Sequence, residues 1–124
     1  MGIEQKGKNQ PKDKLAPKND VFIGEGDLHG KGVYAKRRFR IGQVVIKYNL
    51  KPLTQEEFDA LPANEKDFTH VHREVIYLYS EPERYVNHSD TPNTYQDFVD
   101  KADVALRVIK KGEMITTDAT KDDI

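Results

Sequence analysis

From Val21 onward the chain is a series of short runs rich in β-branched and aromatic residues, each interrupted by Gly, Pro, Asp or Asn. Residues of these types favour strands, and the interruptions are typical of turns. The expected strands are VFIGEG, GVYA, VVIKYNL, VIYLY, YVN, NTYQDFV, DVALRVI and MITT. Because no regular alternation of strand and helix accompanies them, the sequence predicts a mainly β fold and not a parallel α/β sheet.

Helical signal is confined to residues 54–61. Thr54 and Glu57 have the spacing of a capping box, and the segment ends at Pro62. A second short turn is expected through residues 64–68. We therefore expect one small helical insertion within the β domain.

The first twenty residues contain five lysines against three acidic residues, with no aromatic residue and no hydrophobic period. Such a segment cannot bury enough surface to offset the entropy of ordering it. We predict a disordered basic tail over residues 1–20 and one folded domain over residues 21–124. The net charge of the whole chain is -1, so the domain itself is mildly acidic. An acidic domain favours a basic partner such as a lysine-rich peptide, and nucleic acid is not the expected partner.

The chain has no cysteine, which excludes disulfides, thiolate zinc sites, iron-sulfur clusters and cysteine nucleophiles. It has no apolar run of the roughly 18 to 20 residues that a membrane helix needs, and no secretory signal at its start. We expect an intracellular, cytoplasmic protein that does not span a membrane. His70 and His72 have an i, i+2 spacing that suits a shared metal, but no third ligand lies near them in sequence. We expect them on an exposed polar face and predict no metal site.

Two further segments have ordinary interpretations. The glycine-rich stretch GEGDLHGKG over residues 24–32 matches neither a Walker loop nor a dinucleotide loop in its spacing, and leaves Gly30 and Gly32 as a turn before a strand. The basic run KRRFR over residues 36–40 has the composition of a nucleic-acid patch. A solvated connection between a strand and a turn is the expected structure there.

Four segments together resemble the SET-domain family of protein lysine methyltransferases. Residues 85–93, YVNHSDTPN, are similar to the NHSxxPN signature of that family. Residues 30–35, GKGVYA, resemble its GxGVFA opening, and residues 42–48, GQVVIKY, resemble its GEVIxEY strand. Residues 105–116, ALRVIKKGEMIT, are similar to AxRxIxxGEEIT. The four segments occur in the order of the family and span most of the expected domain.

The resemblance implies a SET-type β-clip of several small sheets, with a C-terminal pseudoknot and S-adenosylmethionine bound beside it. Its implied function is methyl transfer from this cofactor to a lysine side chain of a protein or peptide. The implied cofactor-binding residues are Gly30, Lys31, Gly32, Tyr34, Tyr85, Asn87 and His88. Tyr48 matches an aromatic position beside the channel through which the target lysine arrives.

The chain departs from the family at its closing motif. The family ends this motif with Asp-Tyr, whereas here Asp118 is followed by Ala119, so the tyrosine hydroxyl that orients the lysine amine is absent. Tyr48 and Tyr95 are the candidates to supply another catalytic hydroxyl. Only six residues follow Asp118, so a partner or a second copy, as in a homodimer, would complete the channel. Two alternatives stand beside the enzyme: a degenerate domain that binds cofactor or peptide without turnover, and a non-enzymatic β-rich binding module.

Overall fold

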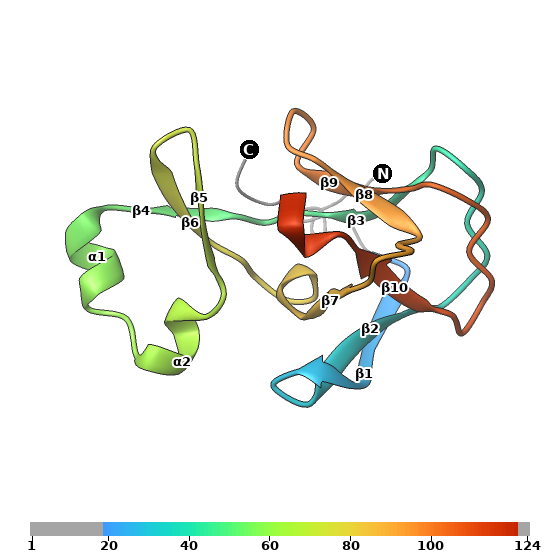
Figure 1. Cartoon of the computed structure of the whole chain (residues 1–124), viewed down its shortest axis with the longest axis horizontal. Coiled ribbons are helices and arrows are strands. Elements are labelled where there is room, and N and C mark those ends of the chain that lie inside the picture. The colour runs from blue at the N-terminus through green and yellow to red at the C-terminus, as the bar shows by residue number, and fades with distance from the viewer. Residues whose placement is uncertain (1–18, 122–124) are drawn as a thin grey trace, which may run out of the picture.

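Three small sheets make up the computed structural model, which describes residues 19–121 (Figure 1). The strands are β1 (Val21–Leu28), β2 (Lys31–Ala35), β3 (Val44–Lys47), β4 (Lys51–Leu53), β5 (Thr69–His72), β6 (Val75–Leu78), β7 (Asn87–His88), β8 (Thr94–Asp97), β9 (Ala102–Ala105) and β10 (Met114–Thr117). The α-helices are α1 (Gln55–Asp59) and α2 (Ala63–Lys66), and two 3-10 turns cover Glu83–Tyr85 and Ala119–Lys121. The predicted mainly β class with a short helical insertion is confirmed.

The sheets pair segments that are far apart in sequence. One sheet has the order β1-β2-β10-β7, the second has the order β3-β9-β8, and the third has the order β4-β6-β5. Strand β10 is antiparallel to β2 and parallel to β7, so the C-terminal strand lies between the hairpin β1–β2 and the segment at residue 87. Figure 1 shows the helices and the third sheet at one end of the molecule. The pseudoknot stays a prediction.

The helical insertion begins as the sequence predicts. Thr54 Oγ1 accepts a hydrogen bond from the Glu57 backbone N–H, and the Glu57 side chain accepts one from the Thr54 backbone N–H, which completes the capping box. The hydrogen bond from the Thr54 backbone also lowers the pKa of Glu57. Helix α1 ends at Asp59, two residues before the expected end at Leu61.

Most of the expected strands have different limits in the structure, and three differences matter for the arrangement of the sheets. The strand expected over residues 44–50 ends at Lys47 as β3, and β4 begins only at Lys51, because β3 pairs with β9 while β4 pairs with β6 of another sheet. Tyr85, expected in a strand, belongs to a 3-10 turn, and the strand begins at Asn87. Strand β9 ends at Ala105, four residues before the expected end. In each case the available pairing partner, which local composition does not specify, sets the limit.

The basic run over residues 36–40 is not a wholly solvated connection. Phe39 is 1% exposed and forms an isolated bridge with Ile109, which is fully buried. The Arg37 guanidinium lies 4.2 Å from the centre of the Phe39 ring and its Nε donates to Asp20 Oδ2 at 2.7 Å. The charged side chains therefore cover an aromatic anchor of the core, as long basic side chains commonly do.

The two histidines of β5 lie on one face, as predicted, but that face is not exposed. His70 is 6% exposed, and its ring stacks on Phe98 with centroids 5.2 Å apart. The His72 ring stacks on Phe98 at 4.7 Å. Tyr48 and Tyr79 complete this aromatic cluster, which joins the third sheet to the second. Their expected exposure was wrong because the aromatic side chains of a neighbouring sheet cover the strand.

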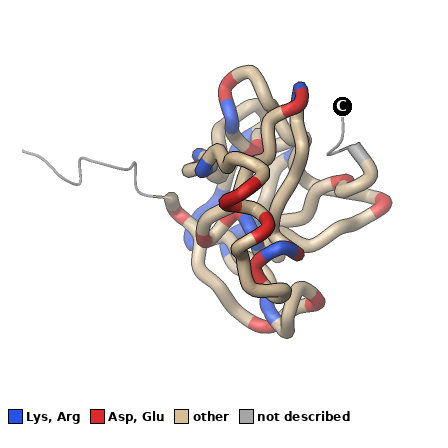
Figure 2. The backbone as a smooth tube through the Cα atoms, turned by 90° about the vertical axis from the view of Figure 1, so that its left-hand side faces the viewer, with Lys and Arg blue, Asp and Glu red and all other residues tan. Residues whose placement is uncertain are grey.

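Among residues 19–121, no helix is long and apolar enough to cross a membrane. Within residues 19–121 no group of three or more His, Asp or Glu side chains is arranged to hold a metal ion. Basic and acidic residues are interspersed along the backbone in the view of Figure 2.

Most of the expected tail, residues 1–18, lies outside the described residues. Asn19, which is described, accepts a hydrogen bond at its Oδ1 from the Lys47 backbone N–H.

Candidate functional site

The hairpin β1–β2 ends in a two-residue turn at His29 and Gly30. Both have positive φ, 53° and 80°, as a type I′ turn requires. The His29 ring contacts the Phe68 ring at 4.7 Å, and its Nε2 lies 3.1 Å from Asp67 Oδ2. The tip of the hairpin is therefore held against the loop that follows α2.

Asn87 brings the hairpin and the NHSxxPN segment together. Its Nδ2 donates to the Lys31 carbonyl at 3.0 Å and to the Tyr85 carbonyl at 2.9 Å, and its Oδ1 accepts from the Asp27 N–H at 2.7 Å. The side chain is 3% exposed. Residues 30–32 and 87–88, which the resemblance assigns to one cofactor site, are thus adjacent. In this arrangement the Asn87 amide holds backbone and positions the hairpin loop.

The second asparagine of the motif fixes the C-terminal strand. Asn93 Nδ2 donates to the Met114 carbonyl at 2.8 Å, and its Oδ1 accepts from the Thr116 N–H at 2.8 Å. Asn93 is 1% exposed. These bonds hold β10 beside the motif, so that the residues after Thr117 emerge next to His88.

His88 contacts those residues directly. Its Nδ1 accepts a hydrogen bond from the Ala119 N–H at 3.0 Å. Because a backbone N–H always donates, the Nε2 of the neutral ring carries the proton and donates to Asp90 Oδ1 at 3.0 Å. The position that replaces the closing tyrosine of the family is therefore held against the NHSxxPN motif.

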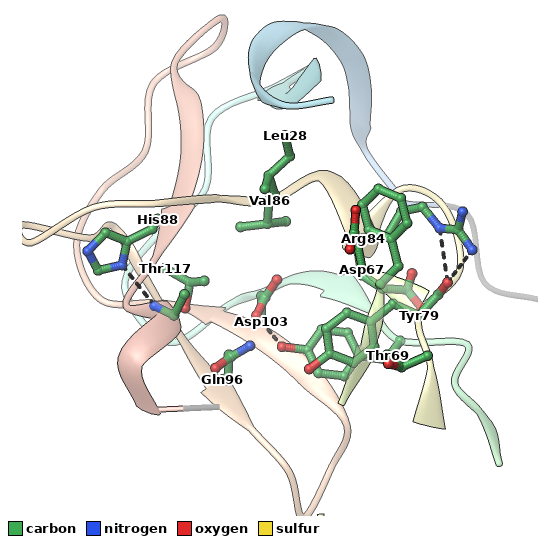
Figure 3. A pocket seen from close by; sticks show the side chains of 14 residues that line it. Leu28, Asp67, Thr69, Tyr79, Arg84, Val86, His88, Gln96, Asp103 and Thr117 are labelled. Atoms are coloured by element: carbon green, nitrogen blue, oxygen red, sulfur yellow. Dashed lines mark hydrogen bonds between the residues drawn. The ribbon is translucent and has the colours of Figure 1, made fainter. Parts of the chain in front are cut away.

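A central pocket opens where these segments meet (Figure 3). Its apolar wall comes from Leu28 of the hairpin, Phe68 and Val86. Its opposite side carries side chains from β8 and β9, and His88 and Ala119 border it. The pocket thus lies between the hairpin, the helical insertion and the C-terminal segment.

Carboxyl groups dominate the charge of the central pocket. Asp67, Glu83 and Asp103 all line it, with Arg84 as a basic neighbour. The Arg84 guanidinium is engaged by Glu65 at 3.1 and 3.2 Å and by the Tyr79 carbonyl. Its charge is therefore already paired, which leaves the pocket with an excess of acidic groups.

Glu83 is the most unusual of these carboxyl groups. One of its oxygens, Oε2, accepts hydrogen bonds from the Asn49 N–H at 2.8 Å and the Ser80 N–H at 3.2 Å. The other, Oε1, is buried and has no hydrogen-bond partner among the described residues. Burial raises the pKa of Glu83 above its ordinary value, because removal from water disfavours the charged form.

We expect Glu83→Gln to increase the free energy of unfolding at neutral pH, because burial raises the pKa of the Glu83 carboxyl. A raised pKa in the folded state means that ionisation of Glu83 weakens folding as the pH rises through that pKa. Below the ordinary value of 4.5 the carboxyl is protonated in both states, so the advantage of the variant should disappear there. Urea denaturation at about pH 4 and pH 7 measures this, with the exposed Glu81→Gln as control. An equal difference at both pH values would contradict it.

Strand alternation separates the two candidate tyrosines. The Tyr48 hydroxyl, which lines the central pocket, donates to Asp103 Oδ1. On β8, Gln96 is paired with Asp103 and lines the same pocket, whereas Tyr95 is paired with Val104, is 45% exposed and lines a different hollow. Successive residues of a strand point to opposite faces, so Tyr95 is turned away from Tyr48.

Of the seven predicted cofactor residues, only His88 lines the central pocket, and the other six lie outside its lining. The Tyr34 hydroxyl donates to the Glu25 carbonyl, and its ring stacks on Phe22 at 5.5 Å. Tyr85 is 8% exposed and packs edge-on against Phe68 at 5.4 Å. Lys31, also predicted at the site, places its ammonium 5.6 Å from the centre of the Tyr85 ring.

The motifs did not identify many of the residues that line the pocket, and three polar ones matter most for its chemistry. These are Glu83, Gln96 and Asp103. The pairing of β8 with β9 places Gln96 and Asp103 side by side in the pocket. The register of that pairing cannot be read from the sequence alone. Glu83 lies next to the NHSxxPN motif in a segment predicted only as a connection, and no pattern marks its burial.

Comparison with known proteins agrees with this geometry. The SET domain family matches residues 30–118, and the chain belongs to this family. The fold is similar to the crystal structure of a candidate histone methyltransferase of Plasmodium falciparum, with a TM-score of 0.64 and 21% sequence identity. That similarity covers 82% of this chain and 94% of the other. No curated protein matches the chain significantly.

Proposed function

We propose that this chain binds S-adenosylmethionine in the central pocket and transfers its methyl group to a lysine side chain of a protein. Proteins of the SET family are lysine methyltransferases. The observation that carries the proposal is that the end of strand β1, the NHSxxPN segment and residue 119 border one acidic pocket, through Leu28, His88 and Ala119.

The pocket lining fits this cofactor. S-adenosylmethionine carries positive charge on its sulfonium and its ammonium, and the excess of carboxyl groups complements both. The unpartnered Glu83 Oε1 is an acceptor for a cationic or hydroxyl donor. Leu28, Phe68 and Val86 offer apolar surface to the adenosine. When bound, the cofactor supplies an activated methyl group.

The protein would then contribute positioning and desolvation. Correct alignment of reacting groups is worth several kcal/mol in favourable cases. Free lysine has a pKa of about 10.4, so the amine must lose a proton before it can react. The aromatic rings of Tyr48 and Tyr79, which pack with centroids 6.0 Å apart, line the pocket and disfavour the ammonium form by excluding water.

One observation favours a second function, cofactor binding without turnover. Ala119 borders the pocket at the position of the closing tyrosine and offers no hydroxyl. Loss of one preorganised polar group slows other enzymes by roughly 100- to 1000-fold. A domain of this kind would retain the cofactor site and act by binding.

Calorimetric titration with S-adenosylmethionine tests the cofactor site, and transfer of labelled methyl to a lysine-rich protein pool tests the reaction. We expect saturable binding that His88→Ala weakens by about 1 to 3 kcal/mol, because the imidazole holds Ala119 at the pocket. His72→Ala is the matched control, since His72 borders a different hollow. Binding without transfer would favour the second function. Absence of binding would overturn both.

A further inference from the structure

A second hollow opens between the tips of two hairpins, outside the central pocket. The lining of this outer hollow includes Arg73, Val75 and Tyr77 from the hairpin β5–β6, and Phe98, Val99 and Lys101 from the hairpin β8–β9. Figure 1 shows the turns of both hairpins on the same side of the molecule. Among the described residues, the two linings have no member in common. The outer hollow is therefore a surface that the cofactor site does not use.

The wall of the outer hollow is apolar and held in place. Val75 and Val99 are both exposed, Val99 by 91%. The Phe98 ring is fixed by its stacking on His72 at 4.7 Å. Asp97 Oδ1 accepts a hydrogen bond from the Val99 backbone N–H at 3.0 Å, which orders the turn of β8–β9. An aliphatic side chain placed between the two valines would remove apolar surface from water.

The charged side chains of this lining are both basic. Arg73 comes from the turn of β5–β6, and Lys101 comes from the turn of β8–β9. The Lys101 ammonium lies 5.8 Å from the centre of the Tyr77 ring. The acidic residues of the same two turns, Glu74 and Asp100, do not line the hollow. Its charge is therefore opposite to that of the central pocket and complements an acidic ligand.

Both basic residues also have a left-handed backbone. The φ angle is 50° at Arg73 and 55° at Lys101. Glycine and asparagine adopt this conformation at lower cost, and two-residue hairpin turns such as residues 73–74 strongly favour them. Residues held in such conformations are concentrated at functional sites. A long basic side chain at each position is thus better explained by an interaction of the side chain than by the needs of the backbone.

We propose that the outer hollow binds an acidic peptide segment of a partner protein. An aliphatic side chain of the segment packs between Val75 and Val99, and the carboxylates that flank it pair with Arg73 and Lys101. Two valines suit an aliphatic side chain better than a flat nucleobase, and a chain with a net charge of -1 offers a long polyanion no general attraction. The inference goes beyond the proposed function and does not depend on it, because no residue of the central pocket takes part.

Titration of the full chain with short peptides tests the proposal. The probes are acetyl-Glu-Leu-Glu-amide, the uncharged acetyl-Gln-Leu-Gln-amide and the basic acetyl-Lys-Leu-Lys-amide, followed by NMR of the valine methyl groups. We expect the acidic peptide to bind about tenfold more tightly than the uncharged one, and the basic peptide to bind least. The methyl signals of Val75 and Val99 should shift. Those of Val71, which borders a different hollow, should not.

Glycine variants separate binding from structure, because they remove the side chain and relieve the backbone together. Arg73→Gly and Lys101→Gly should each weaken binding of the acidic peptide by about threefold. Each should also keep the urea midpoint at or above that of the wild type. Glu74→Gly is the matched control, since its φ is 70° but its side chain does not line the hollow. Its affinity for the acidic peptide should not fall.

Equal binding of the acidic and uncharged peptides by the wild type would overturn the proposal, as would an unchanged preference in both binding variants. Tighter binding of a short oligothymidylate than of the acidic peptide would assign the hollow to nucleic acid instead. Self-association that the acidic peptide does not displace would assign it to a second copy. If a glycine variant is less stable than the wild type, Arg73→Gln and Lys101→Gln test the charge alone, and an unchanged preference in these variants would also overturn the proposal.

Discussion

We expect Ala119→Tyr to transfer methyl from labelled S-adenosylmethionine to a lysine-rich protein pool about 100-fold faster than the wild type. Ala119 borders the central pocket, and His88 Nδ1 holds its backbone N–H at 3.0 Å. A tyrosine at this position would return a hydroxyl to the place where the family carries one. Since Ala119 is exposed, the larger ring should not overpack the core.

The control is Ala119→Phe, which adds the ring without the hydroxyl and should leave transfer close to that of the wild type. If both variants increased the rate of methyl transfer equally, the apolar contact of the ring, and not its hydroxyl, would be the cause of the increase. Rapid transfer by the wild type would instead mean that another group already supplies the function of the tyrosine. Tyr48→Phe, which removes the hydroxyl that orients Asp103, would then be the next variant to assay.

We expect Phe39→Ala to lower the free energy of unfolding by about 3 to 5 kcal/mol. Phe39 is 1% exposed within the main core cluster, and its backbone exchanges two hydrogen bonds with Ile109, at 2.9 and 3.0 Å. Its truncation would leave a cavity and would deprive the Arg37 guanidinium of its ring contact. Urea denaturation followed by circular dichroism measures the change.

Phe22→Ala is the comparison for this variant. Phe22 is 44% exposed and stacks on Tyr34 at the surface of the hairpin, so we expect a loss of about 1 kcal/mol. Equal losses in the two variants would contradict the placement of Phe39 in the core. A pocket-dependent property such as cofactor affinity should be little changed by Phe22→Ala.

The sequence alone determined the properties that depend on local pattern. Short β-type runs broken by turn residues predicted a mainly β fold, and the spacing of Thr54 and Glu57 predicted the start of α1. Four ordered motifs identified the family. Within these motifs, the side-chain amides of Asn87 and Asn93 form hydrogen bonds with backbone groups of other segments. These bonds require an asparagine at a fixed position in the chain, so a short motif is enough to indicate the fold.

Only the tertiary structure decided which side chains share the central pocket. Strand register places Gln96 beside Asp103 and turns Tyr95 to the opposite face, and a shift of one residue would reverse this choice. Burial of His70 depends on Phe98, and burial of Phe39 depends on Ile109, each from a distant segment. Composition describes a residue and its neighbours in the chain, whereas register and burial depend on partners that folding brings from elsewhere.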